Sequence, residues 1–142
     1  MASFADLVSV AKAAGGYTAD IDPTWTVGSK VHGGALLAVL ASAARTAYLD
    51  DGGEPDAAPV VISAEYLGAP DPGHIELRTD VRKRGRTTSF VTVEAVQGDR
   101  VYVQAAVTLA RRDAGEERYA EPLPVDAMPP TPPRCCACSP VR

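Results

Sequence analysis

Residues 32–48 form an apolar stretch with helical spacing and almost no polar face. A surface helix pairs an apolar stripe with a charged back, so a helix that is apolar nearly all round is expected to be buried. The stretch begins with His32, Gly33 and Gly34. Glycines at a helix start leave backbone N–H groups bare and allow another molecule to approach them, and the helix dipole adds to these donors. We therefore predict a buried helix whose open start binds an anion or polarises a carbonyl.

The chain of 142 residues has the length of one domain, and its 46% of hydrophobic residues suffice for a core. A net charge of −4 gives no electrostatic support to nucleic-acid binding. The apolar stretch is too short and too rich in alanine to span a bilayer, and Arg45 interrupts it. Because Asp6 lies where a secretory signal would be basic, we expect no targeting segment. These features predict a soluble cytoplasmic protein that binds neither nucleic acid nor membrane.

Three segments precede the buried helix. Residues 4–14 carry apolar side chains at helical spacing and end at two glycines, which predicts a short amphipathic helix. Residues 17–22 alternate weakly and predict a first strand. Residues 23–31 form a loop that holds Trp25, the only tryptophan.

Four strand patterns follow the buried helix, around residues 60–66, 75–82, 88–96 and 101–109. In the first, Val60, Ile62, Ala64 and Tyr66 fall on one face. In the second, apolar and charged residues alternate strictly, so one face is expected to be buried and the other wet. Short turns join the four strands, and strands joined in this way are antiparallel neighbours. One buried helix followed by an antiparallel meander predicts an α+β fold in which a curved sheet wraps the helix.

Prolines break any regular pattern from residue 122 onward, and we expect residues 122–142 to form a disordered tail. The only cysteines, Cys135, Cys136 and Cys138, lie in this tail, so no disulfide framework holds the predicted fold. A zinc site usually needs four ligands, and the only histidines, His32 and His74, lie far away in the sequence. We therefore expect no metal.

This order of elements resembles the hotdog-fold thioesterases, and in particular the first half of the double-hotdog acyl-CoA thioesterases. The matching motifs are Trp25-x-x-Gly28, His32-Gly33-Gly34, Tyr66-Leu67-Gly68-Ala69-Pro70 and Arg84-Gly85-Arg86. The resemblance implies that residues 1–121 form a single hotdog, the N-terminal half of a double hotdog. Where the family chain crosses to its second hotdog, this sequence runs into proline and cysteine. A truncated or frame-shifted coding sequence is one explanation.

The resemblance implies hydrolysis of an acyl-CoA thioester to a free acid and coenzyme A, which enters only as part of the substrate, so that no cofactor is needed. In such an enzyme a backbone amide at the helix start, here Gly33 or Gly34, polarises the thioester carbonyl, and a carboxylate activates water. The other residues that the resemblance places around the substrate are Trp25, His32, Arg84 and Arg86. Because pantetheine threads between two hotdog units, it also implies a homodimer or pairing with a second hotdog.

The chain departs from the family pattern where an acid is expected. Ala41 occupies the helix position at which single-hotdog relatives carry a carboxylate, and Glu65 is the only carboxylate on the strand after the helix. Glu65 is therefore the candidate base on that strand. The missing helix acid favours an alternative, a non-catalytic acyl-CoA-binding or structural module. A hotdog dehydratase ranks last, because such enzymes usually need an Asp–His pair and His32 has no acidic neighbour in sequence.

Each candidate residue also has a purely structural interpretation. His32 could be a solvent-facing residue before a helix, and the two glycines could serve close helix–sheet packing. Trp25 could fill the core or an interface. Arg84 and Arg86 belong to a basic cluster that is typical of a solvated strand end.

Overall fold

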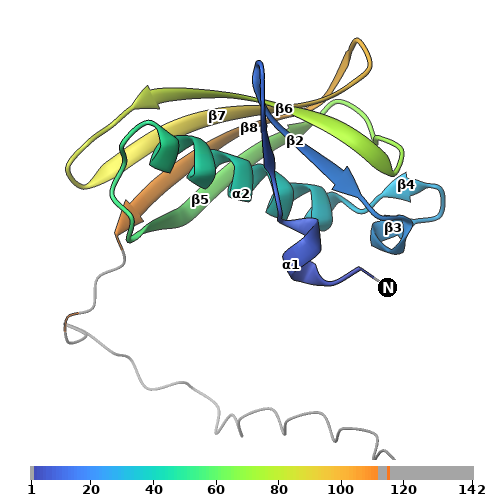
Figure 1. The fold of residues 1–142 in the computed structure, drawn as a ribbon, viewed down its shortest axis with the longest axis horizontal. Coiled ribbons are helices and arrows are strands. Elements are labelled where there is room, and N and C mark those ends of the chain that lie inside the picture. Colours follow the sequence, from blue (N-terminus) through green and yellow to red (C-terminus); the bar gives the residue numbers. More distant parts are fainter. Residues whose placement is uncertain (1, 112–114, 116–142) are drawn as a thin grey trace, which may run out of the picture.

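A curved antiparallel sheet of six strands wraps one long helix, α2 (Gly33–Asp50), in the computed structural model, which describes residues 2–111 and residue 115 (Figure 1). The strand order is β1–β2–β6–β7–β8–β5. The predicted α+β architecture is confirmed. The predicted tail, with all three cysteines, lies outside the described residues. None of the described helices is long and apolar enough to cross a membrane.

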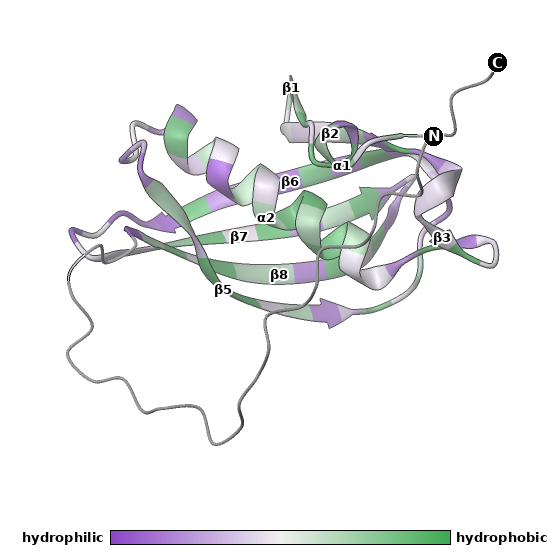
Figure 2. Ribbon diagram, turned by 90° about the horizontal axis from the view of Figure 1, so that it is seen from below, coloured by the Kyte–Doolittle hydropathy of each residue, from purple (hydrophilic) through white to green (hydrophobic). Residues whose placement is uncertain are grey.

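Helix α2 packs on the sheet with one broad face, because its buried residues recur in pairs every four positions and the other positions are half-buried or exposed. Figure 2 shows α2 lying across the sheet, with green apolar positions along both. Val39 and Leu40 are fully buried, and burying a large aliphatic side chain contributes about 1.5–3 kcal/mol. The buried residues of α2 are Ala35, Leu36, Val39, Leu40, Ala43, Ala44, Ala47 and Tyr48.

The four predicted strands are present as β5 (Ala57–Tyr66), β6 (Gly73–Lys83), β7 (Thr88–Gln97) and β8 (Arg100–Arg111). Alternation places Ile75, Leu77, Val91, Val93, Val103 and Val107 in the core. Val60 departs from the expected pattern. A β-bulge between Pro59 and Val61 shifts the register, so Val60 is 48% exposed instead of sharing the inner face with Ile62 and Ala64.

The predicted helix over residues 4–14 is wrong beyond its first turn. Helix α1 spans only Phe4–Leu7, and β1 (Ala11–Ala13) then pairs with β2 (Gly16–Ile21). Gly16 has a φ of 144°, which closes this hairpin, and a Cβ there would collide with the carbonyl of Leu77 on β6. Sheet pairing with β2 therefore outweighs the weak helical spacing of the segment.

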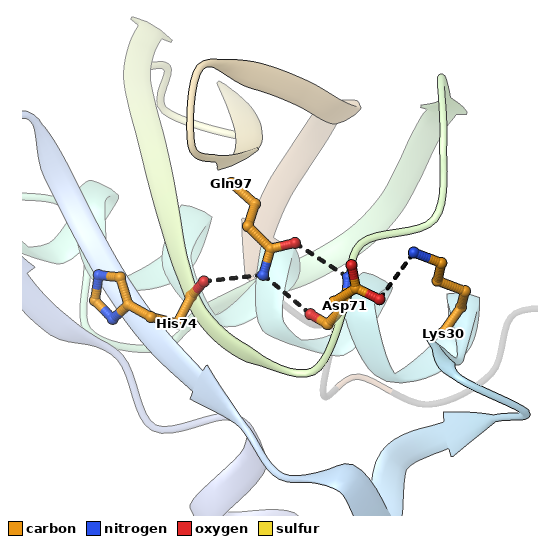
Figure 3. Close-up of polar contacts among 4 residues, drawn as sticks. All are labelled: Lys30, Asp71, His74 and Gln97. Carbon is orange, nitrogen blue, oxygen red and sulfur yellow. Dashed lines mark hydrogen bonds and ion pairs between the residues drawn. The ribbon is translucent and has the colours of Figure 1, made fainter.

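The segment before α2 folds into a 3₁₀ turn, η1 (Pro23–Trp25), and a small hairpin of β3 (Thr26–Val27) and β4 (Lys30–Val31). Side chains tie this hairpin to the sheet (Figure 3). Gln97 donates to the carbonyls of Asp71 and His74 and accepts from the Asp71 N–H, at 3.0–3.2 Å. Lys30 forms an ion pair with Asp71 at 2.8 Å. These contacts hold the approach to α2 in a fixed place.

Candidate active site at the start of helix α2

His32 caps α2 with its own side chain. Its backbone is extended, with φ −64° and ψ 131°, and its Nδ1 accepts a hydrogen bond from the Gly34 N–H at 3.1 Å. A ring nitrogen that accepts carries no proton, so this contact assigns the proton of the neutral imidazole to Nε2. The N–H of Gly34, expected to be bare, is therefore engaged.

The polar groups of Gly33 are used differently from those of Gly34. Within residues 2–111, no hydrogen-bond partner occupies its N–H. Its carbonyl oxygen accepts a hydrogen bond from the Tyr66 hydroxyl at 2.8 Å. Desolvation raises the pKa of Tyr66, so this hydroxyl stays protonated and remains a donor at neutral pH. Of the two glycine amides, the N–H of Gly33 is the one left for another molecule.

Close packing against the sheet backbone does not explain the two glycines. A Cβ on Gly33 would lie 3.4 Å from the Tyr66 ring, which is an ordinary contact. A Cβ on Gly34 would lie 3.0 Å from Cε1 of His32, an exposed side chain. Both neighbours are side chains at the helix start itself, so the glycines leave the first turn of α2 approachable.

Exposed apolar side chains surround this helix start. Tyr66 and Leu67 are 49% and 51% exposed, and Phe4 is 59% exposed with its ring edge-on to Trp25 at 6.2 Å. Trp25 packs on the core, while its carbonyl accepts from the His32 N–H at 2.8 Å. Trp25 thus packs on the core, as its structural interpretation expects, and also adjoins the helix start, where the family resemblance places it.

Arg84 and Arg86 lie at the other end of α2. The guanidinium of Arg84 donates to the Asp51 carbonyl and lies 3.3 Å from the Asp51 carboxylate. Arg86 lines a hollow of about 340 Å³ with Glu54, beside the last turn of the helix. At a rise of about 1.5 Å per residue, the 18 residues of α2 separate its ends by about 27 Å. The structure does not bring these arginines to Gly33 within one chain.

Glu65 lies on the outer face of the sheet. Its neighbours Ala64 and Tyr66 face α2, whereas Glu65 lines a shallow hollow of about 610 Å³ on the opposite face with Arg78 and Glu94. The structure therefore does not bring Glu65 to the helix start of its own chain. The hydrogen bonds and ion pairs around Gly33 and Gly34 involve no carboxylate of the described residues.

Two further observations define what the site can do. Ser42, next to Ala41, donates its hydroxyl to the Val8 carbonyl at 2.6 Å and so fixes the end of α1 against α2. Residues 2–111 contain no group of three or more side chains arranged to hold a metal ion. Among residues 2–111, the site therefore offers a backbone donor and apolar walls, and no carboxylate contacts its two glycines.

Tyr66 was missed by the sequence reasoning, which placed it on the inner face of its strand without a role. The signal was present in the alternation, because the last inward-facing residue of β5 must end near the first turn of α2 when the helix and the following strand run in opposite directions. Its contact with Gly33 joins residues 33 positions apart.

The family assignment agrees with this geometry. Residues 21–110 match the model of the acyl-CoA thioesterase N-terminal domain. The chain is 50% identical over 93 residues to the uncharacterized protein Rv0499 of Mycobacterium tuberculosis, a match that covers 66% of this chain and 32% of Rv0499. It therefore spans about a third of that relative.

Solved structures resemble this fold, and two of them illustrate the match. A candidate thioesterase II from Thermobifida fusca shares 30% identity with a TM-score of 0.75, over 92% of this chain and 47% of that one. A hotdog-fold protein of unknown function from Alicyclobacillus acidocaldarius shares 14% identity with a TM-score of 0.70, over the same proportions. The chain therefore has the hotdog fold and belongs to the acyl-CoA thioesterase N-terminal domain family.

Proposed function

We propose that this chain provides half of an acyl-CoA thioesterase site, in which the N–H of Gly33 donates to the thioester carbonyl oxygen. The observation that carries this proposal is the unpartnered Gly33 N–H at the positive end of a buried helix. His32 and Trp25 flank the carbonyl, and the exposed apolar side chains of Phe4 and Tyr66 offer a surface for the acyl chain.

The donor stabilises the charge that develops during hydrolysis. Water attacks the carbonyl carbon and gives a tetrahedral intermediate whose negative charge sits on the former carbonyl oxygen. The carbon–sulfur bond then breaks, and coenzyme A leaves as the thiolate and takes up a proton. A donor fixed at the position of that oxygen is worth about 10²–10³ in rate. A base must remove the proton from water, and we propose that a second hotdog unit supplies it.

The edge of the sheet at β5 is our candidate for joining that second unit. The described residues leave its outer edge unpaired along ten residues, and Val61 and Tyr66 on it are 59% and 49% exposed. A long, apolar, unpaired edge tends to pair with another strand. In an antiparallel pair, the Tyr66 end of one unit would adjoin the Ala57 end of the other, close to its Arg84 and Arg86. The phosphates of coenzyme A would then meet arginines from the opposite unit.

Light scattering at micromolar concentration tests the pairing. We expect a dimer or a larger species, and Val61→Lys should shift it toward monomer, because a charge on an edge strand opposes pairing. Ala11→Lys, on the short β1 edge, is the matched control and should leave the mass unchanged. A wild-type monomer would contradict the pairing.

A second function has specific support. The absence of a carboxylate at Ala41, together with the outward position of Glu65, favours a unit that binds acyl-CoA without turnover. Losing a general base costs about 10²–10⁴ in rate, whereas ligand contacts can survive. We therefore expect this chain alone to bind acyl-CoA and to hydrolyse it weakly or not at all.

Thiol release from a panel of acyl-CoA esters, measured beside calorimetric binding of the same compounds, separates the two functions. Glu65→Gln, with Glu76→Gln on the same sheet face as control, tests the base. Turnover that only Glu65→Gln abolishes would identify Glu65 as that base, and turnover that persists in both variants would assign the base elsewhere. Binding without turnover supports the non-catalytic unit. No binding to any acyl-CoA would refute the proposed function.

A further inference from the structure

Side chains hold the peptide unit between Gly33 and Gly34 from both of its polar sides. The Tyr66 hydroxyl donates to its carbonyl oxygen at 2.8 Å, and Nδ1 of His32 accepts from its N–H at 3.1 Å. A peptide unit is planar, so two contacts on its opposite sides fix the orientation of the plane. Such restraint matters most at glycine, which otherwise has the widest choice of backbone angles.

The peptide unit on the other side of Gly33 is held as well. This unit joins the His32 carbonyl to the Gly33 N–H, and its carbonyl accepts from the Leu36 N–H at 3.1 Å. The preceding peptide is held too, because the His32 N–H donates to the Trp25 carbonyl at 2.8 Å. With both of its flanking peptide units restrained, Gly33 has little freedom in either backbone angle. The direction of its free N–H is therefore set before any ligand arrives.

We infer that Tyr66 and His32 are positioning residues. They lock the Gly33–Gly34 peptide, and together with the Leu36 bond to the His32 carbonyl this fixes the backbone angles of Gly33 and aims its N–H at the substrate carbonyl. This inference rests on the proposed function, in which that N–H is the donor. A donor contributes most when it is oriented in advance, because no reorganisation is then needed as charge develops. Tyr66 and His32 do so through the backbone.

Tyr66 also connects this donor to the edge of the sheet. It is the last residue of β5, its hydroxyl donates to the Gly33 carbonyl, and a Cβ on Gly33 would make an ordinary van der Waals contact with its ring. A strand that pairs along β5 would cover Tyr66 and restrict its ring. The geometry of the donor would then depend on the second unit, so one residue serves both the edge and the helix start.

Glycine-selective ¹⁵N spectra of the full chain test the lock without any substrate. Tyr66→Phe removes the bond to the Gly33 carbonyl, and we expect the Gly33 and Gly34 amide signals to shift. Tyr102→Phe is the matched control, because no hydrogen bond of the Tyr102 hydroxyl occurs within residues 2–111. Unchanged Gly33 and Gly34 signals in Tyr66→Phe would overturn the inference.

His32 is tested by loss and rescue. His32→Ala removes the acceptor, and we expect amide hydrogen exchange at Gly34 to accelerate about tenfold, the effect of losing about 1.4 kcal/mol of protection. His32→Asn restores an oxygen that can accept at the same helix position, so exchange should return toward the wild-type rate. Equal exchange rates in all three proteins would show that His32 does not protect the Gly34 N–H.

Kinetics of the chain paired with its second unit distinguish this inference from the proposed function. Tyr66→Phe should lower kcat about tenfold or more with KM unchanged, as expected for an interaction made in the transition state. Wild-type kcat in that variant would overturn the inference while the proposed function stands. Failure of the wild type to bind any acyl-CoA would refute the proposed function, and the glycine spectra would still decide whether the lock exists.

Discussion

The two ends of helix α2 differ in how their polar groups are used. At the start, no group of the described residues accepts from the Gly33 N–H, and the side chains of His32 and Tyr66 beside it are exposed. At the end, the N–H groups of Asp51, Gly52 and Gly53 all donate to carbonyls of the last helical turns, at 2.9–3.0 Å. One end is therefore open to another molecule, and the other is closed by the chain itself.

Side chains complete the closed end. Asp50 lies at the negative end of the helix dipole, an unfavourable place for a carboxylate. Its Oδ2 accepts from Lys12 and from the Tyr17 hydroxyl, each at 2.8 Å. Arg84 adds a bond to the Asp51 carbonyl. The end of α2 therefore carries contacts that stabilise the fold, whereas its start offers a donor for the carbonyl of a ligand.

The largest effect on stability is expected from Gly53→Ala at the closed end. A Cβ there would collide with the ring of Tyr48, which is only 4% exposed and cannot move aside. Overpacking of this kind costs about 1–3 kcal/mol. Chemical denaturation measures the loss. Gly15→Ala, where a Cβ meets nothing within 4 Å, is the control, and an equal response of the two variants would break the comparison.

A smaller loss of stability is expected from Tyr17→Phe. This variant deletes the hydroxyl that donates to Asp50 and leaves the ring in place. A hydrogen bond to a protein carboxylate of this kind contributes about 1 kcal/mol or somewhat more. The free energy of unfolding should fall by that amount relative to the wild type, while Tyr102→Phe should change it little. No difference between the two variants would show that Asp50 does not need this partner.

The contribution of Tyr17 should also depend on pH. Desolvation and the hydrogen bond to Asp50 raise the pKa of Tyr17 to about 12, above its ordinary value of 10.0. Since the folded-state pKa is raised, this stabilisation is fully present below pH 10 and is lost as the pH rises through about 12. The gap in unfolding free energy between wild type and Tyr17→Phe should therefore shrink above pH 10. A gap that stays constant through that range would contradict the contact.

Low pH should also weaken the contacts that Asp50 makes with Lys12 and Tyr17. The hydrogen bonds from Lys12 and Tyr17 lower the pKa of Asp50 below 3.8. Because the folded-state pKa is lowered, the ionised Asp50 stabilises the fold at pH values above its ordinary pKa. This stabilisation is lost as the pH falls through the lowered pKa. NMR titration of the Asp50 carboxyl should show this low pKa, and Lys12→Met should raise it. An ordinary pKa for the Asp50 carboxyl would show that the ion pair with Lys12 does not form.

The smallest effect on stability is expected at the open end, from Gly34→Val. The new side chain would displace the exposed imidazole of His32. Valine has a better helix propensity than glycine, which offsets this cost, so the free energy of unfolding should change by less than about 1 kcal/mol. Acyl-CoA binding, in contrast, should weaken sharply, because the side chain blocks approach to the helix start. Calorimetry measures both effects on one sample. A large loss of stability with unchanged acyl-CoA binding would show that the start of α2 serves stability and does not contact the ligand.

The sequence predicts the central helix from its long apolar run and the four later strands from their alternation, which is strictest in β6, because the buried core requires both patterns. The first segment was harder. Local spacing predicts a helix that includes residues 11–13, yet hydrogen bonds to β2 make them a strand, and such pairing is not visible in local spacing. The bulge at Val60 likewise depends on its register with β8.

The candidate site was predictable only in part. The helix start was found from composition, since two glycines before an apolar run are visible in sequence. That His32 engages the Gly34 N–H depends on a side-chain rotamer, and that Tyr66 reaches Gly33 depends on the crossing of helix and strand. The outward position of Glu65 follows from alternation with Ala64 and Tyr66. The distance of Arg84 from Gly33 follows from the length of the helix.

One titration compares the two ends of α2 directly. The glycine-labelled chain would be titrated with acyl-CoA analogues of short, medium and long chain in which a methylene group replaces the thioester sulfur, so that the carbonyl is kept but cannot be hydrolysed. We expect the Gly33 amide signal to shift and saturate with the analogues, whereas coenzyme A alone, which lacks the acyl carbonyl, should leave that signal in place. Saturable shifts at Gly52 and Gly53 with Gly33 unmoved would contradict the assignment of the open end as the ligand site.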